Sequence, residues 1–175
     1  WLNSNDTWFG PTDLCFGPDG AVYISDFHDR RTAHPDPDAK WDRSNGRIYR
    51  VQKAGVASTR PVDVVSLPSA GLVKLLSHAN GWYADRARIE MFRRRDKAIV
   101  PELKAMARRR DDRRMALQGL WAVNASGGLD DAFALEMLAH PEGRVRHWTV
   151  RLLGDRRKVS RRIGLAIVDL AHRET

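Results

Sequence analysis

Residues 26–42 collect the side chains best suited to chemistry. The imidazole and carboxylate groups in this stretch are those of Asp26, His28, Asp29, His34, Asp36, Asp38 and Asp42. Carboxylates in carbonyl-rich loops suit Ca²⁺, and imidazole with carboxylate suits Zn²⁺ or a catalytic base. The spacing matches no defined motif, and prolines and Asx turns are equally typical of a solvated loop. Two interpretations therefore stay open: a solvated loop, or a metal or cofactor contact with Asp26, His28, His34, Asp36 and Asp38 as candidates.

Arginine clusters form the second candidate site. The net charge is +8 overall, but residues 1–67 carry −1 and residues 68–175 carry +9. A basic helical surface can dock an acidic protein or grip phosphates, and cations at helix C-termini also stabilise the exposed carbonyls. Because no aromatic residues alternate with these arginines in sequence, we favour a solvated or protein-docking face over nucleic acid. The candidate residues are Arg93, Arg94, Arg95, Arg156, Arg157, Arg161 and Arg162.

Several activities lack their motifs. The chain has no CxxCH, GxGxxG, Walker or HExxH sequence, so it carries no covalent haem attachment of its own. Its one cysteine, Cys15, lies in an apolar strand pattern and is predicted to be a small buried hydrophobe. No run of 18 apolar residues suggests a membrane span. The chain begins at Trp1 inside a structured pattern, so we expect a fragment of a longer protein.

The first part of the chain predicts strands. Two apolar runs, 12–16 and 21–26, flank the turn-rich sequence FGPDG, and a third run follows at 46–51. A hairpin, a long loop and a third strand make most of one β-propeller blade. Residues 52–70 are rich in Gly, Pro and Ser and predict a linker. We therefore divide the chain into the end of a β-propeller (1–53), a linker (54–70) and a helical part (71–175).

From residue 71 onward the hydrophobic period is helical. Seven helices are predicted at about 71–78, 81–95, 98–109, 112–124, 129–139, 142–154 and 160–172. Ala87, Ala116 and Val145 repeat at a constant offset of 29 residues, and the same register aligns Phe92 with Trp121 and Val150. Both sets are therefore predicted to lie on a buried face. Paired helices at such a period predict an α-solenoid of HEAT-like repeats. The fold class is therefore mixed: a partial β-propeller blade followed by an α-solenoid.

Two stretches of the chain resemble a known family. The first runs from PTDL through FGPDGAVYISDF and HPDPD to GRIYRV, and the second is LVKLLSHANGWYADRA. Both resemble the membrane-bound dehydrogenases of planctomycetes and related bacteria, in which a sugar-dehydrogenase-like propeller precedes HEAT-like repeats and often a c-type cytochrome domain. The chain would cover the last blade and the repeats.

The resemblance implies a function for the whole protein. It implies a periplasmic or membrane-associated dehydrogenase of sugars or alcohols, using pyrroloquinoline quinone, calcium and haem c supplied by other parts. The repeats would then join the propeller to an electron-transfer partner such as a cytochrome domain. The alternative is a non-enzymatic HEAT-like scaffold that binds protein or nucleic acid. We expect the chain alone to be inactive as a dehydrogenase.

Overall fold

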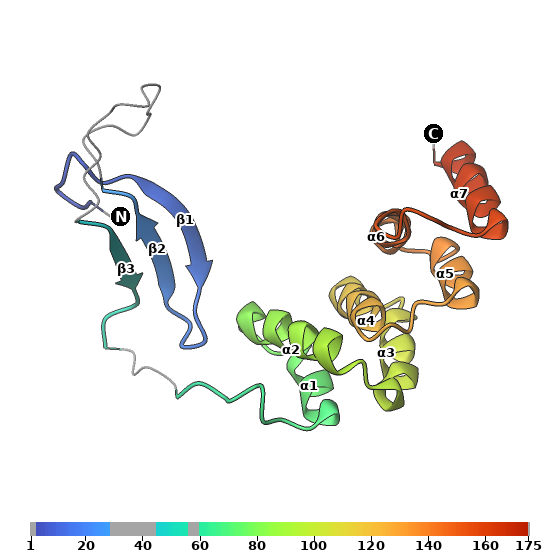
Figure 1. Ribbon diagram of the computed structural model, residues 1–175, viewed down its shortest axis with the longest axis horizontal. Helices are drawn as coiled ribbons and strands as arrows, with labels where there is room; N and C mark the ends of the chain where they lie inside the picture. The colour runs from blue at the N-terminus through green and yellow to red at the C-terminus, as the bar shows by residue number, and fades with distance from the viewer. Residues whose placement is uncertain (1–2, 29–44, 56–59, 175) are drawn as a thin grey trace. The chain divides into compact units, whose positions relative to one another are not determined.

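The computed structural model describes residues 3–28, 45–55 and 60–174. The chain separates into two compact units, Trp1–Val62 and Asp63–Thr175. The first holds a three-stranded sheet and the second holds seven α-helices, so the predicted mixture of β structure followed by α structure is confirmed (Figure 1).

The sheet unit is an antiparallel meander. Strands β1 (Pro11–Phe16), β2 (Val22–Asp26) and β3 (Arg47–Val51) pair in the order β1-β2-β3, close to the predicted strand positions. The β1–β2 turn closes through a hydrogen bond from the Gly17 N–H to the Ala21 carbonyl (2.9 Å). Gly20 has a φ of 78°, a conformation that residues with a Cβ rarely adopt. The turn predicted from the sequence FGPDG therefore requires glycine at this position.

One face of the sheet is apolar and only partly covered. The register places Leu14 beside Ile24 and Phe16 beside Val22, so their side chains share a face. Ile24 is buried, but Leu14 and Phe16 on the edge strand β1 are 55% and 60% exposed. The prediction of a buried Cys15 is wrong: this thiol is exposed, because every residue of β1 is exposed within the described chain.

The helical unit contains the seven predicted helices. Their bounds are α1 Ser69–Leu75, α2 Gly81–Arg94, α3 Val100–Ala107, α4 Arg113–Ala125, α5 Asp131–Leu138, α6 Gly143–Gly154 and α7 Arg161–Arg173, with a 3₁₀ turn η1 at Lys97–Ile99 before α3. Side-chain caps fix several starts, since Asn80, Asp130 and Ser160 each accept a hydrogen bond from a first-turn N–H. The cap of α4 is Asp112, while the preceding Asp111, whose residue type also suits a cap, pairs with Arg109 instead.

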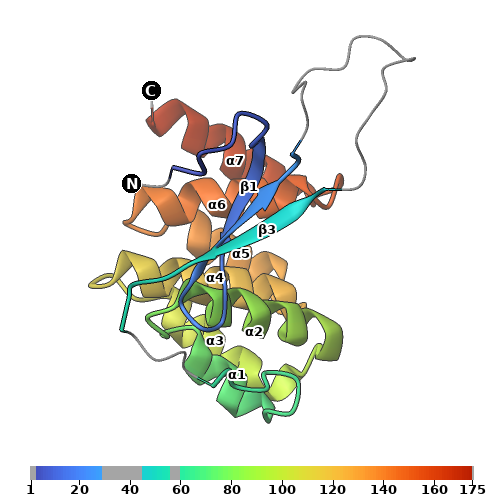
Figure 2. The ribbon, with the colours of Figure 1, turned by 90° about the vertical axis from the view of Figure 1, so that its left-hand side faces the viewer.

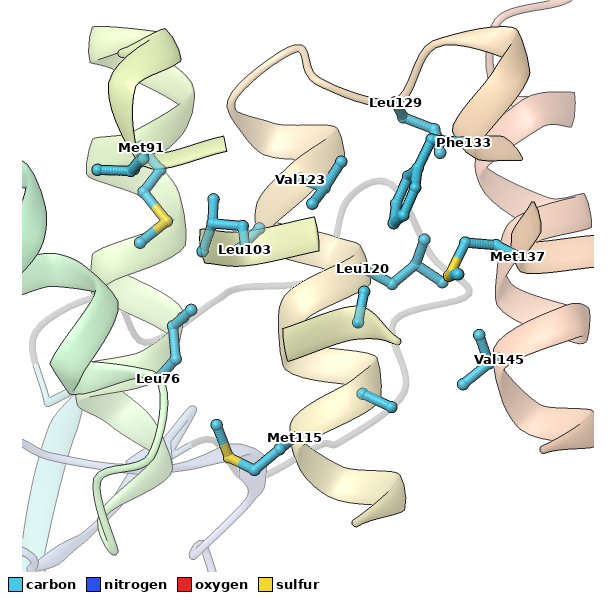
Figure 3. Packing of buried hydrophobic residues seen from close by; sticks show 14 of the residues in the cluster. Leu76, Met91, Leu103, Met115, Leu120, Val123, Leu129, Phe133, Met137 and Val145 are labelled. Carbon is cyan, nitrogen blue, oxygen red and sulfur yellow. The ribbon is translucent and has the colours of Figure 1, made fainter. Parts of the chain in front are cut away.

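The helices form two layers. Within each pair α1 packs on α2, α3 on α4 and α5 on α6, while α4 also contacts α2 and α6, and α5 contacts α7 (Figures 1 and 2). Leu103, Leu120, Phe133 and Met137 lie between the layers in one continuous apolar core (Figure 3). Helices α3 and α4 approach so closely that a Cβ at Gly119 would lie 2.5 Å from the Ala107 nitrogen.

The predicted 29-residue register is confirmed at its small positions and wrong at one bulky position. Ala87, Ala116 and Val145 are all fully buried, at matching places on α2, α4 and α6. Phe92, five residues after Ala87, is 56% exposed, because it lies on the outer side of α2.

The end of the predicted linker belongs to the helical unit. Val64 is buried in the helical core, and the Arg94 guanidinium donates hydrogen bonds to the carbonyl oxygens of Val65 and Leu67, both at 2.6 Å. Residues 63–68 therefore pack against the helical unit, because Val64 is buried in its core and two of their carbonyl oxygens accept hydrogen bonds from α2.

Candidate functional site

Asp26 lies at the centre of a polar network in the sheet unit. Its side chain, at the end of β2, is 0% exposed. Oδ1 accepts hydrogen bonds from the backbone N–H groups of Gly10 and His28, both at 2.9 Å, and Oδ2 accepts one from Arg47 Nε at 3.1 Å. One carboxylate thus joins the N-terminal segment, the end of β2 and the start of β3.

Asp6 and His28 extend this network. His28 Nε2 lies 3.1 Å from Asp6 Oδ2, and Arg47 also donates to that oxygen. The guanidinium of Arg47 is the main reason why the pKa of Asp6 falls from 3.8 to about 2, with a further contribution from the Trp8 backbone N–H. Asp6 is therefore ionised at every physiological pH. His28 has a φ of 40°, and its Nδ1 is buried without a partner among the described residues.

The contacts of this polar network indicate a structural role, not a reaction site. A carboxylate beside an imidazole is the start of an acid–base pair. Here, however, Arg47 neutralises both carboxylates, and His28 Nε2 already faces Asp6. In the part of the chain that the structure describes, no group of three or more His, Cys, Asp or Glu side chains could hold a metal ion. His34, Asp36 and Asp38 lie outside the described residues, so the predicted cofactor contact stays a prediction.

The arginine clusters of the helical unit lie at two opposite edges. Lys97, just after α2, donates to the carbonyls of Ser126 and Gly127 just after α4, and Arg156, just after α6, donates to the Leu129 carbonyl. The C-terminal ends of α2, α4 and α6 therefore share one edge, which holds residues 93–95 and 156–158.

The opposite edge carries a further arginine cluster, formed by residues 108–110, 113 and 114. Arg114 at the start of α4 donates to the His78 carbonyl before α2, and Arg113 pairs with Glu142 at the start of α6. The clusters thus form no continuous basic stripe.

The candidate docking arginines divide into two groups. Arg93 pairs with Glu90 (2.6 Å), Arg94 holds the two carbonyls described above, and Arg156 holds the Leu129 carbonyl, so these three stabilise the fold. In residues 60–174, which are described without a gap, no ion pair is formed by Arg95, Arg157, Arg161 or Arg162.

Polar contacts join neighbouring helix pairs at a regular spacing. Hydrogen bonds connect Lys104 to Asp130, Arg108 to Glu136 and Arg113 to Glu142 across 26, 28 and 29 residues. Arg108 holds the pKa of Glu136 below its usual value through this hydrogen bond. Several of the basic residues are therefore joints between helix pairs, which explains part of the excess of basic residues without any ligand.

A feature that the sequence analysis missed is a row of arginine–aromatic contacts on α2, α4 and α6. Trp121 and Trp148 meet edge to face with ring centroids 5.0 Å apart. Arg88 stacks over Trp121 at 5.2 Å and Arg151 over Trp148 at 5.1 Å. The spacing Trp-x-x-Arg within α6 could have indicated the second contact, since i and i+3 lie side by side on a helix.

A groove lies beside this row. It has a volume of about 380 Å³ and is lined by Asp85, Arg88, Ile89, Phe92, Trp121, Ala125 and Leu152. We call it the aromatic groove. Trp121 was expected in the core but is only partly buried, because its ring forms part of the groove wall.

The comparisons with known proteins give one match. A family model described as a domain of unknown function, DUF7133, matches residues 1–55, a stretch that includes β1, β2 and β3. No curated protein and no solved structure shows a significant match. Among the described residues, no helix is both long enough and apolar enough to span a bilayer.

Proposed function

We propose that the helical unit is a short α-solenoid of HEAT-like repeats that acts as a protein-docking scaffold. Three observations support repeats: the buried positions Ala87, Ala116 and Val145, the two-layer packing, and the polar joints at 26–30 residues. A repeat array offers an extended surface for a partner without needing a catalytic centre.

The aromatic groove carries the docking proposal. Buried apolar side chains already fill the core between the layers, so the outward-facing Ile89 and Phe92 add nothing to it. Exposed apolar side chains beside a groove with cationic neighbours are typical of protein-binding surfaces, in which aromatic residues and arginine are enriched.

We further propose that the sheet unit is part of a β-propeller blade in a larger dehydrogenase. Its exposed apolar face, and a β1 edge that pairs with no further strand among the described residues, support packing against further strands. The family resemblance supplies the oxidoreductase activity, and pyrroloquinoline quinone, calcium and haem c would be held by other parts of that protein. The described residues offer no calcium site at Asp26, because Arg47 and two N–H groups occupy its oxygens.

The charge of the helical unit defines the electron-transfer partner that this proposal requires. Since residues 68–175 carry +9, a docked cytochrome must present an acidic surface. Biolayer interferometry of the purified chain should therefore detect an acidic c-type cytochrome with a micromolar Kd that weakens as salt is raised. A basic c-type cytochrome is the matched control. Equal binding of both, or of neither, would refute the electron-transfer scaffold.

Nucleic acid is a second candidate partner, favoured by the arginines without ion pairs. Arg157, Arg161 and Arg162 follow one another around the start of α7, all exposed. A labelled 20-nucleotide DNA should bind with a log Kd that depends steeply on log salt if several phosphates are contacted. Loss of this binding in the triple variant Arg157→Gln, Arg161→Gln, Arg162→Gln would support nucleic acid, and no binding at low salt would exclude it.

A further inference from the structure

The aromatic groove identifies the chemistry of its occupant. Resting on the docking function proposed above, we propose that it binds a segment of a partner protein in which an aromatic or leucine anchor is flanked by acidic residues.

The walls of the groove select the anchor. Ile89 and Phe92 of α2 stand exposed on one side, and Trp121 and Ala125 of α4 form the other. A volume of about 380 Å³ accommodates one or two large apolar side chains. Phe92 is 56% exposed, and removing its apolar surface from water is the main driving force available here.

The rim of the groove selects the flanking charge. Arg95 stacks over Phe92 at 5.0 Å, and Arg151 stacks over Trp148, which in turn contacts the groove residue Trp121. Neither arginine forms an ion pair within residues 60–174, whereas Arg88, inside the groove, is neutralised by Asp85. The interior is thus electrically balanced and the rim is cationic, which is complementary to an apolar anchor between carboxylates.

An extended nucleic acid fits this arrangement less well. Arg95 and Arg151 stack on aromatic rings beside an apolar groove that contains a carboxylate, Asp85. Arg157, Arg161 and Arg162, the other candidate arginines without ion pairs, follow α6 and are not among the residues that line the groove. A peptide with one anchor uses the groove and both rim charges together.

A peptide-display selection tests the proposal directly. The probe is a library of random 12-residue peptides selected against the immobilised chain. We expect enrichment of sequences with Phe, Trp or Leu flanked by Asp and Glu. Enrichment of basic peptides, or no enrichment, would overturn the proposal.

Matched variants locate the binding site of the selected peptides. Phe92→Ala should weaken binding by about tenfold or more, the loss typical of a central aromatic anchor, and Arg151→Gln should weaken it by about threefold while reducing its salt dependence. The controls are Leu165→Ala, which removes a side chain that is 62% exposed on α7, and Arg110→Gln. Controls that weaken binding as strongly would refute this location, and circular dichroism of each variant shows whether the helices remain folded.

Two further outcomes separate this inference from the broader docking proposal. If an acidic cytochrome binds the Phe92→Ala variant as tightly as the parent chain, docking stands and the groove assignment fails. If sedimentation shows a dimer of the parent chain that Phe92→Ala dissociates, the occupant is a second copy, which overturns a partner segment.

Discussion

The two units of this chain are held together by different forces. The helical unit encloses a continuous apolar core that runs through all seven helices, and most of its ion pairs lie at the surface, the buried Glu90 with Arg93 being an exception. Among the described residues of the sheet unit few side chains are fully buried, and the fully covered Asp26 carboxylate connects three segments instead. The helical unit thus depends mainly on hydrophobic burial, whereas the sheet unit depends on a small polar network and leaves an apolar face exposed.

Removing a core side chain of the helical unit should have the largest effect. Leu103→Ala empties a fully buried position between α3 and α4 and should lower the free energy of unfolding by about 2–5 kcal/mol. Urea unfolding monitored by far-ultraviolet circular dichroism measures the change. Leu165→Ala is the matched control on an exposed site and should change it by less than about 1 kcal/mol. Equal losses would contradict a core located between the layers.

Two glycine substitutions test how closely α3 and α4 pack against each other. In Gly119→Ala the new methyl group would meet the backbone of α3, so the helices must separate at a cost of about 1–3 kcal/mol. Gly164→Ala on α7 meets nothing within 4 Å and should stabilise the helix by up to about 1 kcal/mol. Thermal unfolding should therefore move in opposite directions for the two variants, and a shift in the same direction would argue against the close approach of α3 and α4.

In the sheet unit the matching test removes a charge instead of a volume. Asp26→Asn keeps the size but replaces one acceptor oxygen with an amide that confronts N–H donors, so the sheet should lose about 1–3 kcal/mol. Hydrogen exchange of the β2 amides measures this loss locally. Asp13→Asn, at an exposed position of β1, is the control. Unchanged exchange in Asp26→Asn would show that the Asp26 carboxylate does not stabilise the sheet, so the two units would not differ in this way.

Lowering the pH should also weaken the polar network of the sheet unit, with a smaller effect than the substitutions above. The pKa of Asp6 is depressed in the folded state to about 2 from its ordinary 3.8, so its ionisation stabilises the sheet above about pH 4. That contribution is lost as the pH falls from about 4 through 2. The Trp8 backbone N–H donates to the Asp6 carboxylate, and its signal in nitrogen-15 NMR should shift over this range in the parent chain and show a weaker dependence in Asp6→Asn. Identical titrations of the two proteins would place the acid-sensitive group elsewhere.

The positions of the elements could be predicted from sequence, but the outward faces could not. Helix periodicity and strong caps such as Ser160 are local signals, so the seven helices and three strands lie close to their predicted positions. Whether Phe92 faces the core or the solvent depends on which side of α2 the neighbouring helices cover, and a 29-residue register alone does not determine that. The contact between Arg88 and Trp121 joins residues of two different helices, α2 and α4, so no local pattern predicts it.

Some contacts between segments of the helical unit also bear on how such a protein can change over evolutionary time. Arg94, Lys97, Arg114 and Arg156 donate to main-chain carbonyls of another segment, whereas Lys104, Arg108 and Arg113 pair with side chains. Every residue has a carbonyl, so the position that accepts from a contact of the first kind can mutate freely while the contact persists. Selection then acts on the side chain of the donor alone. Helix stacks held by contacts of this kind can diverge widely in sequence while their packing stays the same.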